Sequence, residues 1–368
     1  MNAIRILVVD DSVVIRKLLC DTLASDPALE VAGSASDGRI ALAKIQQLRP
    51  DLVTLDVEMP VMNGLETLVE LRKLHPSMPV IMFSTLTERG GAATLEALSL
   101  GASDYATKPS NTGSPAVAIE RIRAELIPKI KALCAVRVKP APTAPRPISR
   151  PKAPLNRRVE IVAIGTSTGG PNALAEVLPK IPRDLPVPIV VVQHMPPIFT
   201  RLLADRLASR SVIPVDEGTA GAMLSPAHAW IAPGNYHMTV NRSGLQSRLG
   251  LNQNPPENSC RPAVDVLFRS VAAAYRANVL AVVMTGMGSD GALGAQCIRE
   301  AGGEVIVQDE ASSVVWGMPG LVYQNGQADA VYAIDRLASE ITRRVLAAPA
   351  GSNAREVNTL SAVERPAK

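Results

Sequence analysis

The chain has 368 residues, of which 47% are apolar and 20% charged, and its formal net charge is +4. This balance excludes a disordered chain and suggests two or three domains. No apolar run approaches the roughly 18 residues that span a bilayer, and Asp10 and Asp11 stand where a signal peptide would be apolar. Four scattered cysteines without a C-x-x-C pair exclude a zinc ribbon and are typical of a reducing cytoplasm. We expect a cytoplasmic protein that does not insert into membranes.

The positive charge is concentrated in one Pro-rich segment. Nine Lys and Arg residues and no acid lie between 126 and 158, so the rest of the chain has 29 basic against 34 acidic residues, a net charge of −5. Six prolines between 140 and 154 are typical of a semi-extended linker. A nucleic-acid-binding arm is the alternative, but no aromatic residue or helix-turn-helix accompanies the charge. We therefore predict a linker and no nucleic-acid partner.

The first 125 residues alternate short apolar runs with segments of helical periodicity. The apolar runs cover 4–10, 29–34, 51–56, 79–84 and 103–107, and the helical patterns cover 13–24, 38–48, 64–74 and 89–100. This alternation predicts an α/β domain with a five-stranded, doubly wound parallel sheet. Ligands of such sheets bind beyond the carboxyl ends of the strands.

Those strand ends carry polar groups that suit phosphoryl transfer. The groups are Asp10, Asp11, Asp56, Ser84 and Lys108. Carboxylates gathered at one edge repel one another unless a cation lies among them, and oxygen ligands suit Mg²⁺. A carboxylate is also a competent nucleophile towards a phosphoryl group whose charge a cation and a lysine neutralise. The alternative is that the acids only cap the helices that follow them.

Several motifs of this half resemble the receiver domain of two-component response regulators. They are VDDS at 9–12, LDVEMP at 55–60 with NG at 63–64, ST at 84–85 and KP at 108–109. The resemblance implies a flavodoxin-like fold in which Asp56 accepts the phosphoryl group, and a Mg²⁺ site formed by Asp10, Asp11 and Asp56. It also implies that Ser84 and Lys108 contact the phosphoryl oxygens.

A strand, a turn of small residues and a helix open the second domain. Residues 159–164 form a mostly apolar run, residues 165–171 read GTSTGGP, and residues 172–178 have helical periodicity. This is the context of a nucleophile elbow, which presents a serine, here Ser167, at the head of a helix. One alternative is a dinucleotide phosphate loop, but the next strand does not end in the expected acid. A purely structural glycine turn is the other.

Two further strand ends supply partners for Ser167. His194 follows the apolar run 187–192 and Gln193, and Asp290 follows the apolar run 279–285. In a parallel sheet all three residues reach the same edge. A serine needs a base to take its proton, and a carboxylate orients and stabilises that base. The chain order Ser–His–Asp excludes an α/β-hydrolase; a lone histidine at a strand end is often only structural.

Together with the receiver and the linker, this domain resembles the CheB family of chemotaxis protein-glutamate methylesterases. The matching motifs are IGTSTGGP at 164–171, QHMP at 193–196, RPAVD at 261–265 and TGMGSDG at 285–291. The resemblance implies a doubly wound, mostly parallel sheet with Ser167 as nucleophile, His194 as base and Asp290 as the group that orients it. It also implies that the Met287 N–H binds the oxyanion and that Thr168 helps to position His194.

The resemblance implies a phosphorylation-activated enzyme. Its substrates would be glutamate methyl esters on methyl-accepting chemoreceptors, with release of methanol, and receptor glutamines, which it would deamidate. A chemotaxis histidine kinase would be the phosphodonor, Mg²⁺ would serve the receiver, and the hydrolysis would need no cofactor. We predict a receiver over 1–125, the linker over 126–158, the catalytic domain over 159–347 and a disordered tail over 348–368. A transcriptional regulator and a binding module on an inactive hydrolase fold remain as alternatives.

Some residues of both domains have two interpretations. Tyr105 is either a rotamer switch, as the receiver resemblance implies, or a packing residue. Cys260 is a rival nucleophile, but the sequence identifies no partner histidine for it. Arg261 either recognises an acidic substrate or pairs with Asp265. The segment 229–249 predicts a β-hairpin insert that serves as scaffold or as a lip beside the active site.

Two positions depart from the CheB pattern. Thr166 stands where we expect alanine, and Ala263 where we expect serine. Neither departure removes a catalytic group, although the Thr166 hydroxyl can alter the packing of the elbow.

Overall fold

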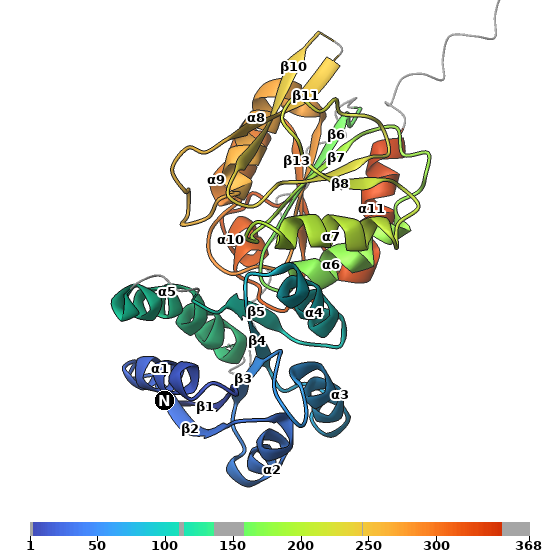
Figure 1. Ribbon diagram of the computed structural model, residues 1–368. Coiled ribbons are helices and arrows are strands. Elements are labelled where there is room, and N and C mark those ends of the chain that lie inside the picture. Colours follow the sequence, from blue (N-terminus) through green and yellow to red (C-terminus); the bar gives the residue numbers. More distant parts are fainter. Residues whose placement is uncertain (1–2, 110–113, 136–157, 245, 348–368) are drawn as a thin grey trace, which may run out of the picture.

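The computed structural model describes residues 3–109, 114–135, 158–244 and 246–347, which form two α/β units (Figure 1). The predicted linker from residue 136 to 157 and the predicted tail from 348 lie outside the described residues. Within the described ranges, no helix has both the length and the apolar character needed to cross a bilayer.

The first unit is the predicted five-stranded parallel sheet, with strand order β2-β1-β3-β4-β5. Its strands are β1 Ile4–Val9, β2 Leu29–Ala35, β3 Leu52–Asp56, β4 Val80–Ser84 and β5 Asp104–Thr107. Its helices are α1 Val13–Ala24, α2 Gly38–Leu48, α3 Gly64–Leu74, α4 Glu88–Ser99 and α5 Pro115–Ala135. The inner strands β3 and β4 are buried along their whole length, because helices cover both faces of the sheet.

Helix α5 extends beyond the predicted end of the receiver. Leu126, Ile130 and Leu133 follow one another at helical spacing and are buried in the core of the first unit. The basic residues of this stretch also belong to the receiver, since Lys129 donates to the Tyr105 carbonyl and Lys131 binds Asp26. Residues 126–135 were assigned to the linker because of their charge, but that charge lies on an amphipathic helix.

The second unit is a seven-stranded parallel sheet with strand order β14-β13-β12-β6-β7-β9-β8. Its strands are β6 Ile161–Thr166, β7 Ile189–Gln193, β8 Val215–Glu217, β9 Ala229–Ile231, β12 Val279–Val283, β13 Glu304–Gln308 and β14 Ala330–Tyr332. Its helices are α6 Gly170–Val177, α7 Phe199–Ala208, α8 Val264–Tyr275, α9 Ala292–Glu300, α10 Met318–Gln324 and α11 Ile334–Leu346, with short 3₁₀ helices at Leu178–Lys180 and Arg276–Asn278.

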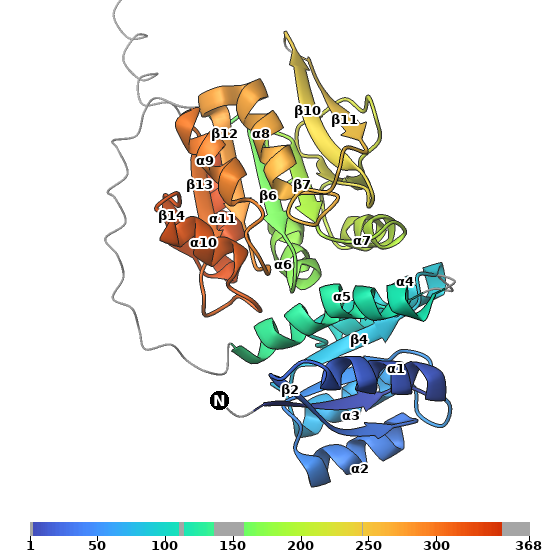
Figure 2. The same cartoon turned by 90° about the vertical axis from the view of Figure 1, so that its left-hand side faces the viewer.

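The predicted hairpin is present but begins later than expected. It consists of β10 His237–Ser243 and β11 Gln246–Asn252, which pair antiparallel and pack against α8 (Figure 2). Residues 229–231 were expected in this insert, but they form β9 and run parallel to β7 in the main sheet. Ala229 and Ile231 are buried there, so their apolar alternation serves the sheet and not the hairpin.

The two units pack against each other through α4, β5 and α5 of the first unit (Figures 1 and 2). Helix α4 contacts α6 and α7 of the second unit. The ring of Tyr105 stacks on that of Phe199 with centroids 5.1 Å apart, and Val315 joins the apolar cluster that includes α5. The first unit therefore covers the end of the second sheet from which α6 begins.

Candidate active site and phosphoryl-accepting site

The turn after β6 has the geometry of a nucleophile elbow. Ser167 follows the last residue of the strand and is half-buried, and Gly169 adopts φ +78°, a conformation that glycine takes without strain, immediately before α6. The Thr166 hydroxyl donates to the Thr285 carbonyl at 2.9 Å, so the departure from alanine is accommodated by a buried hydrogen bond. The Gln193 side chain donates to the Ser167 carbonyl at 3.0 Å. The elbow is thus fixed from both neighbouring strands.

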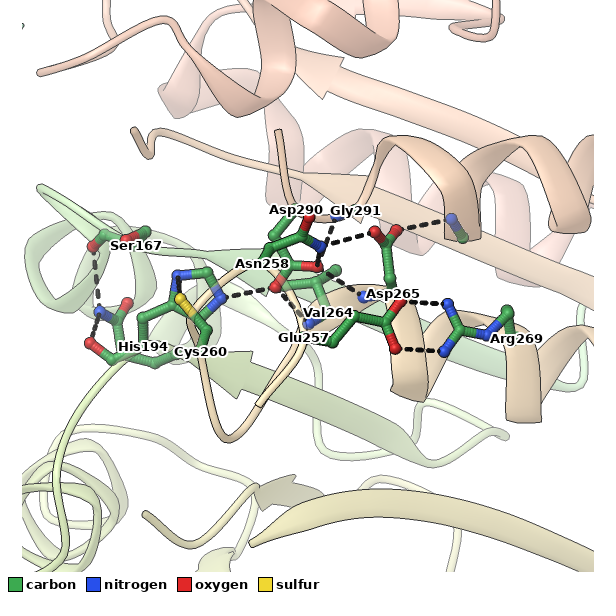
Figure 3. A network of polar contacts seen from close by, with 12 residues as sticks. Ser167, His194, Glu257, Asn258, Cys260, Val264, Asp265, Arg269, Asp290 and Gly291 are labelled. Atoms are coloured by element: carbon green, nitrogen blue, oxygen red, sulfur yellow. Dashed lines mark hydrogen bonds and ion pairs between the residues drawn. The ribbon is translucent and has the colours of Figure 1, made fainter. Parts of the chain in front are cut away.

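The half-buried His194 and the buried Asp290 form a hydrogen-bonded pair (Figure 3). His194 Nε2 lies 2.7 Å from Asp290 Oδ2. The Asp290 carboxylate also accepts N–H groups from Val264 at 2.6 Å, Asp265 at 2.9 Å and Gly291 at 3.0 Å. Two of these donors begin α8, where unpaired N–H groups favour a negative charge. Asp290 is therefore held as a charged partner for the imidazole.

The contacts of His194 favour its protonated form in this arrangement. Burial alone would lower the pKa of His194, but hydrogen bonds to Asp290 and Cys260 raise it to about 10. The same imidazolium lowers the pKa of Asp290 against the effect of burial. Cys260 Sγ lies 3.5 Å from His194 Nδ1. The expectation that Cys260 has no histidine partner was wrong, because the two residues are 66 positions apart and only the fold brings them together.

The predicted nucleophile and base lie near each other without a direct hydrogen bond. The Gln193 amide binds the carbonyls of both Ser167 and His194, which links their backbones. Among the described residues, however, the Ser167 hydroxyl makes no hydrogen bond to His194. Thr168, predicted to position His194, donates its hydroxyl to Asp104 of the receiver at 2.8 Å. The receiver therefore engages the residue next to the predicted nucleophile.

The loop after β12 passes directly beside the elbow. A Cβ atom added to Gly286 would lie 2.9 Å from Ser167 Cβ, so only glycine allows this approach. Met287 follows, and its N–H has no hydrogen-bond partner within the described ranges. Gly288 has φ +91°, which turns the chain towards Asp290. The loop thus brings an available N–H close to the predicted nucleophile.

Arg261 is occupied by neighbouring loop segments. Its guanidinium donates to the carbonyls of Gln253 and Asn254 at 2.9 and 3.0 Å and to the Asn235 side chain. Asp265, the partner considered from the sequence, accepts hydrogen bonds from the Gly294 N–H and from Asn258 instead. Of the two interpretations of Arg261, the pairing with Asp265 is excluded in this structure.

The receiver brings four of its predicted site residues together. Carboxylate oxygens of Asp10, Asp11 and Asp56 lie within 4.8 Å of one another. Lys108 Nζ lies 2.9 Å from Asp10 Oδ2 and 2.7 Å from Asp56 Oδ2. The Ser84 hydroxyl, in contrast, donates to the Gly90 carbonyl at 3.1 Å. Ser84 is thus at the predicted strand end but has a local partner.

The electrostatics of this cluster fit a divalent cation. Burial raises the pKa of Asp56 to about 6, although Lys108 acts in the opposite direction. Burial also raises the pKa of Asp10. One lysine therefore does not compensate the buried carboxylates, and an oxygen-only ligand set of this kind suits Mg²⁺.

Comparison with known proteins identifies the family of each unit. Residues 162–341 match the family model described as CheB methylesterase, and residues 6–120 match that of the response regulator receiver domain. A relative from Trichodesmium erythraeum, named protein-glutamate methylesterase/protein-glutamine glutaminase, is 54% identical and covers 94% of this chain and 100% of its own length. A relative of the same name from Nocardioides sp. is 52% identical, with 94% and 96% covered.

A solved structure gives the same assignment for the second unit. The catalytic domain of the Thermotoga maritima CheB methylesterase is 40% identical to this chain, with a TM-score of 0.50. It covers 50% of this chain and 98% of its own length. The chain therefore belongs to the CheB family of protein-glutamate methylesterases/protein-glutamine glutaminases and carries a response regulator receiver domain at its N-terminus.

Proposed function

We propose that the chain hydrolyses glutamate methyl esters on methyl-accepting chemoreceptors in the cytoplasm and deamidates receptor glutamines. The names of the relatives support both activities. The partly buried 2.7 Å hydrogen bond between His194 and Asp290, beside the elbow that presents Ser167, carries the proposal. A histidine oriented by a buried carboxylate is what a serine needs to become a nucleophile.

The first half of the reaction forms an acyl-enzyme. Ser167 Oγ attacks the γ-carbonyl of the ester while His194 takes the serine proton. Nδ1 is the nitrogen that accepts it, since Nε2 is bound to Asp290. Asp290 stabilises the imidazolium, and the Met287 N–H binds the oxyanion of the tetrahedral intermediate. The Cys260 contact at Nδ1 must give way for this step.

The second half releases the products and restores the serine. The intermediate collapses, the ester C–O bond breaks, and methanol leaves with the proton held by His194. A water molecule then attacks the acyl-enzyme, His194 takes its proton, and the glutamate carboxylate leaves as Ser167 regains its own proton. A glutamine side chain follows the same course with ammonia in place of methanol.

The receiver would control this reaction through phosphorylation of Asp56 by a chemotaxis histidine kinase. Asp10, Asp11 and Asp56 are the residues that would hold Mg²⁺, which neutralises phosphoryl charge when it is bound. Lys108 would supply a second positive charge. Ser84 would contact the phosphoryl oxygens after leaving the Gly90 carbonyl.

In the unphosphorylated chain the receiver would restrain the catalytic elbow. The buried Asp104 holds the Thr168 hydroxyl, and the Leu98 carbonyl accepts a hydrogen bond from Asn172 of α6 at 2.7 Å. Met287 belongs to the apolar residues packed against the cluster that contains α5. The receiver thus contacts the turn that carries Ser167, and the loop that is proposed to bind the oxyanion packs against the apolar cluster that includes α5. A receptor side chain would reach the site only after this contact loosens.

Strand β5 connects the phosphorylation site directly with the interface between the two units. Lys108 follows the strand and binds Asp56, while Asp104 and Tyr105 at its other end contact the catalytic unit. When Lys108 follows the added phosphoryl charge, the strand to which it is attached shifts with it.

Methanol release from methyl-esterified receptor tests both parts of the proposal. We expect release to rise with a small-molecule phosphodonor and Mg²⁺, and this rise to disappear in Asp56→Ala. No release under either condition, with intact receptor, would leave the receiver assignment standing and reject this substrate. Measurement of ammonia from receptor glutamines tests the deamidation in the same way.

A further inference from the structure

The loop from Glu257 to Arg261 borders the His194–Asp290 pair (Figure 3). The Glu257 carboxylate forms two hydrogen bonds of 2.6 Å with the guanidinium of Arg269 on α8. Arg261, at the other end, is bound by two backbone carbonyls. The loop is therefore anchored on both sides of its central residues.

Asn258 is part of this loop, and its side chain binds two buried carboxylates at once. Its Nδ2 is 2.9 Å from Asp265 Oδ2 and 3.0 Å from Asp290 Oδ1. Asp265 and Asp290 expose only 0% and 2% of their surface. Buried charges need hydrogen-bond donors to remain charged, and a single amide here serves both acids.

Few other groups compensate these two charges. Backbone N–H groups donate three hydrogen bonds to Asp290 and one, from Gly294, to Asp265. Within the described part of the chain, Asn258 is the only side-chain donor to Asp265, and the only one besides His194 to Asp290. Without it, the two acids would face each other with no side chain shared between them.

The electrostatic surroundings are unfavourable to two negative charges. Burial and the Asp290 charge raise the pKa of Asp265, while hydrogen bonds from Gly294 and Asn258 lower it in part. Glu257 adds a further negative charge, which its pair with Arg269 offsets. His194 is the positive group on the far side of Asp290, and Cys260 lies beyond it.

We propose that Asn258 is a positioning residue of the hydrolysis, whose shared amide keeps Asp265 and Asp290 charged together and holds Asp290 towards His194. This inference rests on the proposed serine hydrolysis and adds a residue to it. Asn258 acts through Asp290 and has no contact with the reacting atoms.

Two substitutions remove the shared donor in different ways. Asn258 has φ +53°, so Asn258→Gly removes the amide without straining the backbone. Asn258→Asp keeps the shape of the side chain and the tolerance for this φ, but replaces the donor with a third carboxylate. Ser259→Gly is the matched control, because the adjacent Ser259 is exposed and has φ +61°.

We expect Asn258→Gly to lower kcat by about 10- to 100-fold, the effect of losing a hydrogen bond to a buried charge, with little change in KM. The acidic limb of kcat/KM moves to higher pH, because the pair His194–Asp290 holds its proton more tightly when the carboxylate loses a donor. Asn258→Asp shifts the limb further in the same direction, and Ser259→Gly behaves like the wild type.

Removal of the second carboxylate provides the decisive comparison. In Asn258→Gly combined with Asp265→Asn, one of the opposed charges is gone, so the shared donor is no longer needed. We expect this double variant to regain most of the lost kcat and the wild-type acidic limb. A double variant no better than Asn258→Gly overturns the proposal, since a merely structural role of Asn258 would not be rescued by neutralising Asp265.

An NMR titration of the His194 ring tests the same inference without activity. The chain has only four histidines, and single His→Gln variants of the other three assign the signals. The ring should titrate at higher pH in Asn258→Gly and return in the double variant. If the wild type releases no methanol, the proposed function fails on its own account, whereas an unchanged titration in Asn258→Gly rejects the role of Asn258.

Discussion

At the scale of single residues, Ser167 is the group on which the proposed hydrolysis depends. Ser167→Ala should lower methanol release by about 10⁴- to 10⁶-fold, because it removes the hydroxyl that is proposed to form the acyl-enzyme. A fluorophosphonate probe should label the wild type and not the variant. Cys260→Ala is the control, since Cys260 is the rival nucleophile that the fold places against the same histidine. Activity of Ser167→Ala close to the wild type would assign the reaction to Cys260.

Cys260 also has a predicted effect on the base. Its hydrogen bond to His194 Nδ1 raises the pKa of the imidazole, so Cys260→Ala lowers that pKa and frees the neutral base at lower pH. We expect the acidic limb of kcat/KM to move down by about half to one pH unit, the size of one weak hydrogen bond. Cys297→Ala on α9 serves as the control. An unchanged limb in Cys260→Ala would show that the thiol leaves Nδ1 before catalysis begins.

At the scale of elements, the carboxyl ends of β1 and β3 place buried carboxylates close together in the receiver, which is electrostatically unfavourable. The pKa of Asp56 is about 6 in the fold and 3.8 as its ordinary value, so the folded chain binds this proton more tightly than the unfolded chain. The contribution of Asp56 to stability therefore falls as the pH rises from about 4 to about 6 and stays low above that.

Replacing Asp56 with an uncharged residue should remove the loss of folding stability that its charged form causes. At pH 7.5 without divalent ions, Asp56→Asn should raise the receiver Tm by about 4 °C or more, and the difference should vanish below about pH 4. Addition of Mg²⁺ should raise the Tm of the wild type more than that of Asp56→Asn. Calorimetry in EDTA and in Mg²⁺ measures both effects, and equal responses of the two chains would remove Asp56 from the cation site.

Periodicity and parallel-sheet topology explain why most of this arrangement was predictable from the sequence. Apolar runs identified the buried strands, and the rule that parallel strands end at one edge brought Ser167, His194 and Asp290 together. The contacts of Asn258 and Cys260 were not predictable, because they come from a loop without periodicity that packs against residues distant in sequence. Residues 126–135 were predicted to be linker because of their positive charge, but a charge count does not distinguish an amphipathic helix from a linker.

At the scale of the whole molecule, the interface between the receiver and the catalytic unit combines buried contacts with solvent-exposed ones. Tyr105 stacks on Phe199 and Asp104 binds Thr168 in its buried part. Its rim carries the ion pair between Glu88 of α4 and Arg201 of α7, whose side chains are 70% and 52% exposed. A phosphoryl group can release such an interface only by a difference in free energy between the two arrangements. Because the rim contacts are weak, phosphorylation needs to supply only a small free-energy difference to release the interface.

The rim ion pair permits a test of autoinhibition in the full-length chain without changes in either active site. Glu88→Arg or Arg201→Glu alone places like charges opposite each other, so each should raise the unphosphorylated rate of methanol release by about two- to fivefold, the worth of an exposed pair. The double charge swap restores the attraction and should restore the wild-type rate. High salt should reduce all these differences. Single variants with wild-type rates, or a swap that fails to restore inhibition, would mean that the receiver does not restrain the enzyme through this face.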